Sequence, residues 1–300
     1  MKTRFLNITN FSIVLLCLWT PFAQAKLVEE IIKVPVKANN SYGKASEQDI
    51  VVTLFYDDTA AKPYPLAIIN HGRSVKPEER AAFGRATSIT NARWLTRMGF
   101  LVAVPTRMGY GVSGGEDVED SGNNCSNKNY PPGYEAAASQ TLQILHTVRS
   151  RPHVAPDRAI VLGVSYGGTT AVTVAAKSPP GVQAVLNFAG GGGGNLATQA
   201  QQPCSPSRLK DMFANYGTTS RMPMLWVYAE DDAYFGPKYP REWFDAFKDK
   251  GGVGEFMQVP PTGKDGHGLF SNAPEIWRPK ALEFLKANGF PDLRELEITK

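Results

Sequence analysis

A serine flanked by glycines stands out in the stretch AIVLGVSYGGTTAVTVAAK, residues 159–177. The stretch begins with apolar residues typical of a strand and ends with a helical pattern. Ser165 lies at the change, within Gly163-Val164-Ser165-Tyr166-Gly167. Glycines on both sides let a strand and a helix approach closely around a tight turn. A hydroxyl exposed on such a turn can act as a nucleophile when a neighbouring base takes its proton.

This order of strand, Gly-x-Ser-x-Gly and helix resembles the nucleophile elbow of the α/β hydrolases. In that elbow the turn exposes the hydroxyl above the sheet and directs the next backbone N–H toward the same space. The alternative is a glycine-rich turn in which Ser165 only caps the helix that begins at Tyr166. Because a cap does not require both glycines, we favour the nucleophile.

A serine hydroxyl needs a base, and the base needs an acid to orient it. In α/β hydrolases the acid and then the histidine follow the serine along the chain. Of the four histidines only His267 follows Ser165, and it lies in DGHG, between the last expected strand and the last expected helix. His267 is therefore the predicted base.

The acid is expected just after the apolar run Met224–Tyr228, where three carboxylates are adjacent: Glu230, Asp231 and Asp232. Charge alone does not choose between them, because such a cluster is usually a solvated acidic turn. The usual family pattern has a glutamate two positions before the acid, and Glu230 stands two positions before Asp232. The resemblance implies Asp232 as the catalytic acid, with Asp231 as the alternative.

Acyl transfer also requires hydrogen-bond donors for the oxyanion that forms. The resemblance places one donor at the Tyr166 N–H and the other in the loop after the third strand, which reads NHGR at residues 70–73. Gly72 lets the backbone approach a substrate, and the Arg73 N–H is the predicted second donor. His71 precedes the serine and belongs to this loop, so we interpret it as structural.

Eight apolar runs have the length and the branched or aromatic content of strands. They are Val28–Val36, Ile50–Tyr56, Leu66–Ile69, Leu101–Val104, Ala159–Leu162, Ala184–Phe188, Met224–Tyr228 and Phe256–Val259. From the third onward they alternate with helical patterns, at Thr87–Met98, Tyr134–Arg149, Tyr166–Lys177, Arg241–Lys248 and Pro274–Ala287. This alternation predicts a mainly parallel eight-stranded sheet with helices on both faces, whose first two strands form an antiparallel edge.

Two stretches interrupt the alternation, Arg107–Pro132 and Gly190–Gly217. Both follow expected strands, so both are expected at the carboxyl edge of the sheet, where open α/β folds bind ligands. Residues 26–300 are thus predicted to form a single domain with loop insertions near 106–134 and 190–220.

The N-terminal residues have the pattern of a secretory signal peptide. Lys2 and Arg4 precede the short apolar run FSIVLLCLW, and an Ala-x-Ala pattern ends at Ala25. Residues 1–25 are predicted to be removed, which implies a periplasmic or secreted protein. An uncleaved membrane anchor is the alternative, but the apolar run is shorter than a membrane-spanning helix requires.

The cysteines fit export. Cys17 lies in the predicted signal peptide, which leaves Cys125 and Cys204, an even number in a compartment where disulfides persist. We expect them to pair and to connect the two long loops above the site. The alternative is a pair of separate buried thiols.

Composition narrows the class of partner. Without Lys2 and Arg4 the 32 basic residues fall to 30 against 28 acidic ones, which is too weak a balance to indicate nucleic-acid binding. No later run approaches ~20 consecutive apolar residues, so no membrane-spanning helix is expected. His146 and His153 lack metal-ligand spacing with acidic or cysteine partners, and neither a metal nor an organic cofactor is expected.

From about residue 48 to 287 the chain resembles the dienelactone-hydrolase-like branch of the α/β-hydrolase superfamily. The motifs are NHGR, RMGYGVSGG, GVSYGG, LWVYAEDD and DGHG, in that order. Dienelactone hydrolases proper use a cysteine nucleophile where this chain has Ser165, and Thr106 replaces the aspartate common before the RMGYG-type loop. The resemblance therefore implies a serine esterase that cleaves small carboxylic esters through an acyl-enzyme, without a cofactor.

Two other classes of function remain open from the sequence. One is a serine peptidase or amidase of the same fold, although such peptidases usually carry a large additional domain. The other is a hydrolase fold used only for binding, which usually shows as a lost member of the triad, whereas Ser165, Asp232 and His267 are all present.

Overall fold

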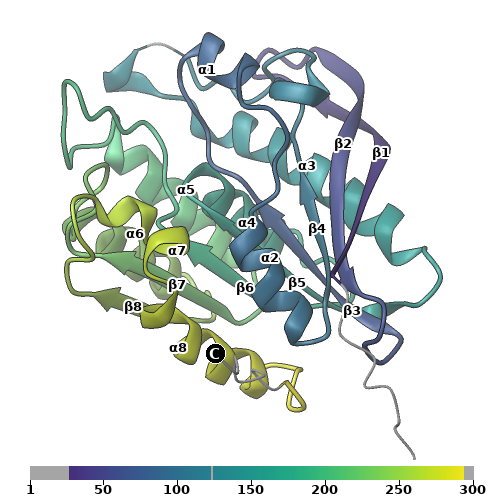
Figure 1. The fold of residues 1–300 in the computed structure, drawn as a ribbon. Coiled ribbons are helices and arrows are strands. Elements are labelled where there is room, and N and C mark those ends of the chain that lie inside the picture. Colours follow the sequence, from purple (N-terminus) through teal and green to yellow (C-terminus); the bar gives the residue numbers. More distant parts are fainter. Residues whose placement is uncertain (1–26, 123, 294–300) are drawn as a thin grey trace, which may run out of the picture.

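The computed structural model describes residues 27–122 and 124–293, so the predicted signal peptide lies outside the described residues. The described chain forms one eight-stranded sheet in the order β1-β2-β4-β3-β5-β6-β7-β8, with helices on both faces (Figure 1). β1, β2 and β4 are antiparallel neighbours, and all the other pairings are parallel. The strands are β1 Leu27–Asn39, β2 Ala45–Asp57, β3 Tyr64–Asn70, β4 Leu101–Pro105, β5 Val154–Val164, β6 Val182–Phe188, β7 Met224–Ala229 and β8 Gly254–Val259. The predicted sheet and its antiparallel edge are confirmed.

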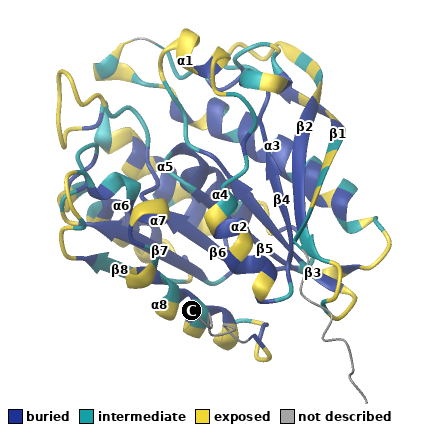
Figure 2. Ribbon diagram, in the orientation of Figure 1, coloured by how far each residue is buried: buried dark blue, intermediate teal, exposed yellow. Residues whose placement is uncertain are grey.

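The burial of each strand follows from its place in the sheet. The central parallel strands are covered on both faces and are apolar almost throughout, as β4 and β7 show. The edge strand β1 instead alternates between exposed residues and the buried side chains of Val34, Val36 and Ala38. Figure 2 shows this contrast, with dark blue central strands beside a β1 that changes colour along its length.

Helices form a layer on each face of the sheet. They are α1 Pro77–Ala81, α2 Ile89–Arg97, α3 Tyr130–Arg149, α4 Tyr166–Ala176, α5 Pro206–Thr219, α6 Lys238–Asp249, α7 Leu269–Asn272 and α8 Pro274–Ala287, with short 3-10 helices at Gly111–Ser113, Cys125–Asn127 and Gly266–Gly268. α2 and α8 meet through the rings of Trp94 and Trp277, whose centroids are 5.1 Å apart. On the opposite face Trp226 of β7 contacts Phe213 of α5 and Phe244 of α6.

One of the two stretches expected to be irregular contains a long helix. The sequence predicts no element in Gly190–Gly217, but α5 begins at Pro206 within it. Proline suits the first turn of a helix, where its missing N–H has no intrahelical role. The buried residues Leu209, Met212, Phe213 and Tyr216 then repeat at helical spacing. This periodic signal was present in the sequence, and the glycine run before it obscured the start of the helix.

The register of the parallel strands brings four segments to one edge of the sheet. Asn70 at the end of β3 pairs with Gly163 of β5, Val164 pairs with Phe188 of β6, and Phe188 pairs with Val227 of β7. The chain therefore leaves β3, β5, β6 and β7 at nearly the same level. The segments that follow these strands contain NHGR, Ser165, the glycine run and the acidic cluster.

Candidate active site

Ser165 lies on a sharp turn between β5 and α4. Its backbone has φ 56° and ψ −126°, a region that residues with a side chain rarely occupy and that is found mainly at functional sites. Its N–H donates to the Phe188 carbonyl at 2.9 Å, which holds the turn against β6. A Cβ on Gly163 would meet the Gly167 carbonyl, and a Cβ on Gly167 would meet the Asn70 carbonyl. The two glycines are therefore required by close backbone packing around the serine.

Asp232 and His267 form a hydrogen-bonded pair. His267 Nδ1 lies 3.0 Å from Asp232 Oδ2, and the Asp232 side chain is fully buried. The other carboxylate oxygen, Oδ1, accepts from the backbone N–H groups of Tyr234 at 2.8 Å and Phe235 at 3.0 Å. Both oxygens are thus engaged, and the orientation of the carboxylate toward the imidazole is fixed.

Asp231 is turned away from His267. Its carboxylate accepts from the backbone N–H of Thr262 at 3.0 Å and of Gly263 at 3.2 Å, in the loop after β8. Glu230 is exposed. The structure therefore brings Asp232, rather than Asp231, to the histidine.

Asp265 is a supporting residue that the sequence reasoning did not single out. Its Oδ1 accepts from the His267 N–H at 2.9 Å and from the Ala233 N–H at 3.0 Å. One carboxylate oxygen thus connects the histidine loop to the segment that follows Asp232. The available signal was an aspartate directly before a short helical turn, a position that favours a side-chain cap of this kind.

Two aromatic residues lie between His267 and the cavity that Ser165 lines. The rings of Tyr234 and Phe235 lie 4.3 Å and 5.2 Å from the imidazole, and both side chains line the cavity that contains Ser165. Among the described residues no hydrogen bond joins the Ser165 hydroxyl to His267. In ligand-free hydrolases this contact is often looser than in the reacting complex.

Two backbone N–H groups next to Ser165 have no acceptor among the described residues, those of Tyr166 and Arg73. Tyr166 is the first residue of α4, so its N–H has no partner within the helix. Gly72 packs against Ser165, and a Cβ there would lie 3.3 Å from the Ser165 Cβ. The 72–73 peptide and the start of α4 therefore border the serine from two sides.

His71 is fixed behind this loop. The Arg107 backbone N–H donates to His71 Nε2 at 3.1 Å, so that nitrogen carries no proton. The proton is on Nδ1, which donates to the Gly72 carbonyl at 2.7 Å. Burial, and then the positive charge of Arg107, hold the pKa of His71 well below its ordinary value. The neutral ring fits a structural role.

A buried ion pair supports the same loop. Arg107 Nε lies 2.5 Å from Glu119 Oε1, and both side chains are fully buried. The guanidinium also donates to the carbonyls of His71 at 2.7 Å and Gly72 at 3.3 Å. Tyr110 donates its hydroxyl to the second Glu119 oxygen at 2.8 Å. Sequence reasoning did not predict this network, because its members lie in non-periodic segments.

The Arg73 side chain is held by an acidic partner. It forms a two-pronged ion pair with Asp117, with both N–O distances at 2.7 Å. Arg80 reaches the same carboxylate at 2.8 Å. Burial is the largest single effect on the Asp117 carboxyl and acts to raise its pKa, but the hydrogen bonds and charge of Arg73, together with the charge of Arg80, lower the pKa below its ordinary value. Asp117 thereby holds the Arg73 side chain, and with it the loop at residues 70–73, in one position.

The cavity at Ser165 is small, about 70 Å³. Its walls include Arg73, Tyr130, Tyr166, the glycines at 191–194, Tyr234 and Phe235. A larger groove of about 920 Å³ lies elsewhere, between β1 and α3, and none of the predicted catalytic residues lines it. We place the candidate site at the smaller cavity because Ser165 lines it together with Tyr234 and Phe235, the ring neighbours of His267.

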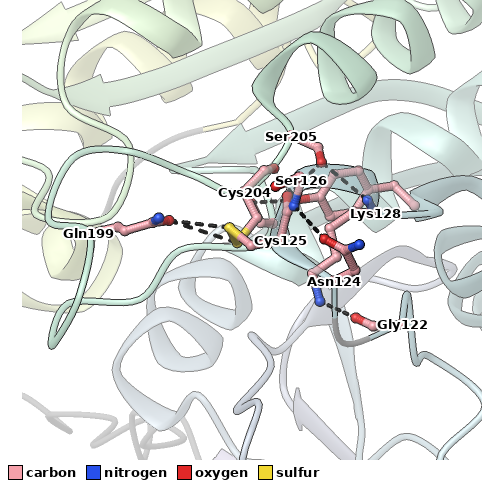
Figure 3. The surroundings of a disulfide bond; sticks show 10 residues. Gly122, Asn124, Cys125, Ser126, Lys128, Gln199, Cys204 and Ser205 are labelled. Carbon is pink, nitrogen blue, oxygen red and sulfur yellow. Dashed lines mark hydrogen bonds between the residues drawn. A yellow bond between two sulfur atoms is a disulfide. The ribbon is translucent and has the colours of Figure 1, made fainter.

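A disulfide joins Cys125 to Cys204, as the sequence predicts. It connects the loop after β4 to the loop after β6. Figure 3 shows that Ser205 extends this connection: its hydroxyl donates to the Cys125 carbonyl at 2.7 Å and accepts from the Lys128 N–H at 3.1 Å. Both loops contribute walls to the cavity at Ser165 or to the cavity beside it.

Two further searches cover the described ranges 27–122 and 124–293. Within them no group of three or more His, Cys, Asp or Glu side chains is arranged to hold a metal ion. None of the helices there combines the length and the hydropathy needed to cross a membrane.

Comparisons with known proteins agree with the fold. An acetyl xylan esterase from a Paenibacillus species is 17% identical, with a TM-score of 0.58 over 88% of each chain. A dienelactone hydrolase-like promiscuous phosphotriesterase from metagenomic libraries is 14% identical, with a TM-score of 0.53 over 87% of this chain and 99% of the other. An acylaminoacyl peptidase is 12% identical, with a TM-score of 0.58. The match covers 92% of this chain but only 43% of the peptidase.

At these identities the structural neighbours establish the α/β-hydrolase fold expected from the sequence. No curated protein sequence matches the chain significantly. The model of the dienelactone hydrolase family matches residues 80–251, more than half of the chain, and this range includes Ser165 and Asp232. The chain therefore belongs to the dienelactone hydrolase family.

Proposed function

We propose that this protein is a serine hydrolase that cleaves carboxylic esters through an acyl-enzyme intermediate. The observation that carries the proposal is the Asp232–His267 pair, placed beside a cavity that also contains Ser165 on its strained turn. An acid, a base and a nucleophile in this relation match the roles required for acyl transfer. Membership of a hydrolase family supports the same reaction class.

In the proposed reaction the Ser165 oxygen attacks the acyl carbon, and its proton passes to His267 Nε2. Asp232 holds the Nδ1–H and stabilises the imidazolium that forms. The Tyr166 and Arg73 N–H groups donate to the negatively charged carbonyl oxygen. As the C–O bond breaks, Nε2 returns the proton to the leaving alcohol, and water activated by His267 then releases the acid from Ser165.

We also propose that the protein is exported. The sequence pattern of residues 1–25 and the Cys125–Cys204 disulfide support this, because disulfides persist in oxidising compartments. Processing of the full chain in an exporting host, followed by N-terminal sequencing of the product, tests the cleavage after Ala25. Recovery of unprocessed chain in the cytoplasm would contradict export.

Matched ester and amide substrates test the reaction class. We expect the purified mature protein to hydrolyse p-nitrophenyl esters with kcat/KM at least about 1,000-fold above that for p-nitroanilides of the same acids. Acetylated xylan belongs in the panel, because a structural neighbour is named for it. Faster cleavage of the amides would favour the peptidase alternative. No turnover of any substrate by folded protein would favour a binding function.

The disulfide gives a second test, made with the Cys125→Ser/Cys204→Ser double variant. Its loss should lower the free energy of unfolding by at most about 4–5 kcal/mol, the loop-entropy value for a closed loop of this length. The folded sheet already restrains the loops, so the measured loss in a denaturant titration should be smaller. KM should rise more than kcat falls, because the bridge shapes access rather than the triad. Two alkylatable thiols in the unreduced native protein would contradict the bridge.

A further inference from the structure

We propose that the site accepts only short acyl groups, acetyl or propionyl, and holds a larger alcohol portion in a second, outer cavity beside the disulfide. This inference rests on the proposed ester hydrolysis and adds the substrate class. The inner cavity at Ser165 has a volume of about 70 Å³. Pockets for drug-sized ligands usually have about 300–1,000 Å³, so the inner cavity holds a few heavy atoms.

Two buried rings of the inner wall, those of Tyr130 and Tyr166, are held at their hydroxyl ends. The Tyr130 hydroxyl donates to the Cys204 carbonyl, and the Tyr166 hydroxyl donates to the Glu119 carbonyl at 3.3 Å. Tyr134 does not line the cavity but supports its wall: its ring stacks on that of Tyr166 with centroids 4.2 Å apart, and its hydroxyl donates to the Gly191 carbonyl at 2.8 Å. Rings held at both the backbone and the hydroxyl end resist displacement by a longer chain.

Another part of the inner wall is bare glycine backbone that packs closely against side chains. A Cβ at Gly191 would lie 2.7 Å from the Phe235 ring, and one at Gly192 would lie 2.5 Å from the Tyr134 hydroxyl. A Cβ at Gly194 would lie 2.5 Å from Tyr234. The glycine run thus passes directly against rings. Because densely packed interiors resist expansion, each additional methylene should meet these walls.

The outer cavity is about four times larger, about 280 Å³. It shares Val75, Lys128, Gly193 and Gly194 with the inner cavity, so the two adjoin. Its other walls are Cys125, Asn195, Thr198, Gln199 and Cys204, from the two loops that the disulfide connects. These walls are mainly exposed loop residues, in contrast to the buried tyrosines.

The position of Ser165 assigns the two cavities. In the acyl-enzyme the acyl carbon is bonded to the Ser165 oxygen, so the acyl group stays in the cavity that Ser165 lines. Ser165 lines the inner cavity and is not among the residues that line the outer one. The alcohol portion, which leaves when the acyl-enzyme forms, therefore extends toward the adjoining outer cavity.

Two series of esters test whether the acyl group and the alcohol portion occupy different cavities. With p-nitrophenol as the constant alcohol and acyl chains from two to eight carbons, kcat/KM should fall at least about 100-fold between acetyl and hexanoyl, given about 10-fold or more per misfitting methylene. With acetate as the constant acid and alcohols from methanol to a glycoside, kcat/KM should change less than about 10-fold.

Variants of one wall residue in each cavity sharpen the test. Tyr130→Ala should raise the hexanoyl-to-acetyl ratio of kcat/KM at least about 10-fold, whereas Tyr130→Phe, which retains the ring, should keep the ratio low. Thr198→Trp should slow the esters of bulky alcohols and leave the acyl ratio unchanged. Thermal melts of each variant check that it is folded.

The outcomes distinguish failure of the short-acyl inference from failure of the proposed ester hydrolysis. Equal rates for acetyl and hexanoyl esters in the wild type would overturn the short-acyl inference while ester hydrolysis stood. Folded Tyr130→Ala with an unchanged ratio would overturn the assignment of the tyrosine wall to the acyl group. Absence of hydrolysis across both series would instead overturn the proposed function, and with it this inference.

Discussion

Ser165→Ala is expected to lower kcat for ester hydrolysis by about five to six orders of magnitude, the loss typical when a serine hydrolase loses its nucleophile. The change removes the oxygen that would form the acyl-enzyme and leaves the binding groups in place. Alanine retains the Cβ, so the strain at φ 56° is the same, and the melting temperature should shift by no more than a few degrees. Steady-state assays with a p-nitrophenyl ester, together with thermal melts, measure both effects.

Ser178→Ala is the matched control. Ser178 also has a positive φ, 47°, and lies just beyond the other end of α4, where its side chain is exposed. The same chemical change there should leave kcat and KM within about twofold of the wild type. Activity of Ser165→Ala above about 1% of the wild type, from protein purified free of host esterases, would remove Ser165 from the role of nucleophile.

Asp232→Asn is expected to reduce kcat about 10⁴-fold, as for the equivalent change in a serine protease. The bonds around the carboxylate give the reason. The Tyr234 and Phe235 N–H groups require an acceptor at the Oδ1 position, so the amide NH₂ must face His267. A donor against Nδ1 forces the imidazole proton onto Nε2, which can then no longer take the proton of the serine.

Asp231→Asn is the comparison variant, because it makes the same change one residue away. The Asp231 carboxylate accepts from backbone N–H groups of the loop after β8. In Asp231→Asn one of the two acceptor oxygens becomes an NH₂ group, which should lower the free energy of unfolding by about 1 kcal/mol. Its kcat should remain within about tenfold of the wild type. A greater loss in Asp231→Asn than in Asp232→Asn would transfer the role of the acid to Asp231.

Local patterns in the sequence were sufficient for much of this architecture. Strands such as Leu101–Pro105 are short apolar runs between turn residues, and the elbow around Ser165 carries its glycines within five positions. The identity of the acid needed more than local pattern. Asp231 and Asp232 are adjacent and chemically identical, and only the fold shows which carboxylate meets His267.

The parts that sequence reasoning missed depend on distant contacts or on competing signals. Glu119 and Arg107 are twelve residues apart in a stretch without periodicity, so no pattern predicts their buried pairing. The helix α5 does have an apolar period, but the glycine run before it favours a loop reading of the whole segment. The size of the inner cavity follows from the ring positions of Tyr130 and Tyr166, which composition does not specify.

The bonds on the Gly72 carbonyl determine how the 72–73 peptide behaves during the reaction. In a trans peptide the C=O and the following N–H point in opposite directions. His71 and Arg107 hold the Gly72 oxygen on the interior side, so the Arg73 N–H is held facing outward. A peptide dipole held in this way need not reorient when negative charge develops on the substrate oxygen. The free-energy cost of orienting it has already been offset when the protein folds. Because burial holds the pKa of His71 well below its ordinary value, this ring stays neutral in mild acid and the dipole stays in position.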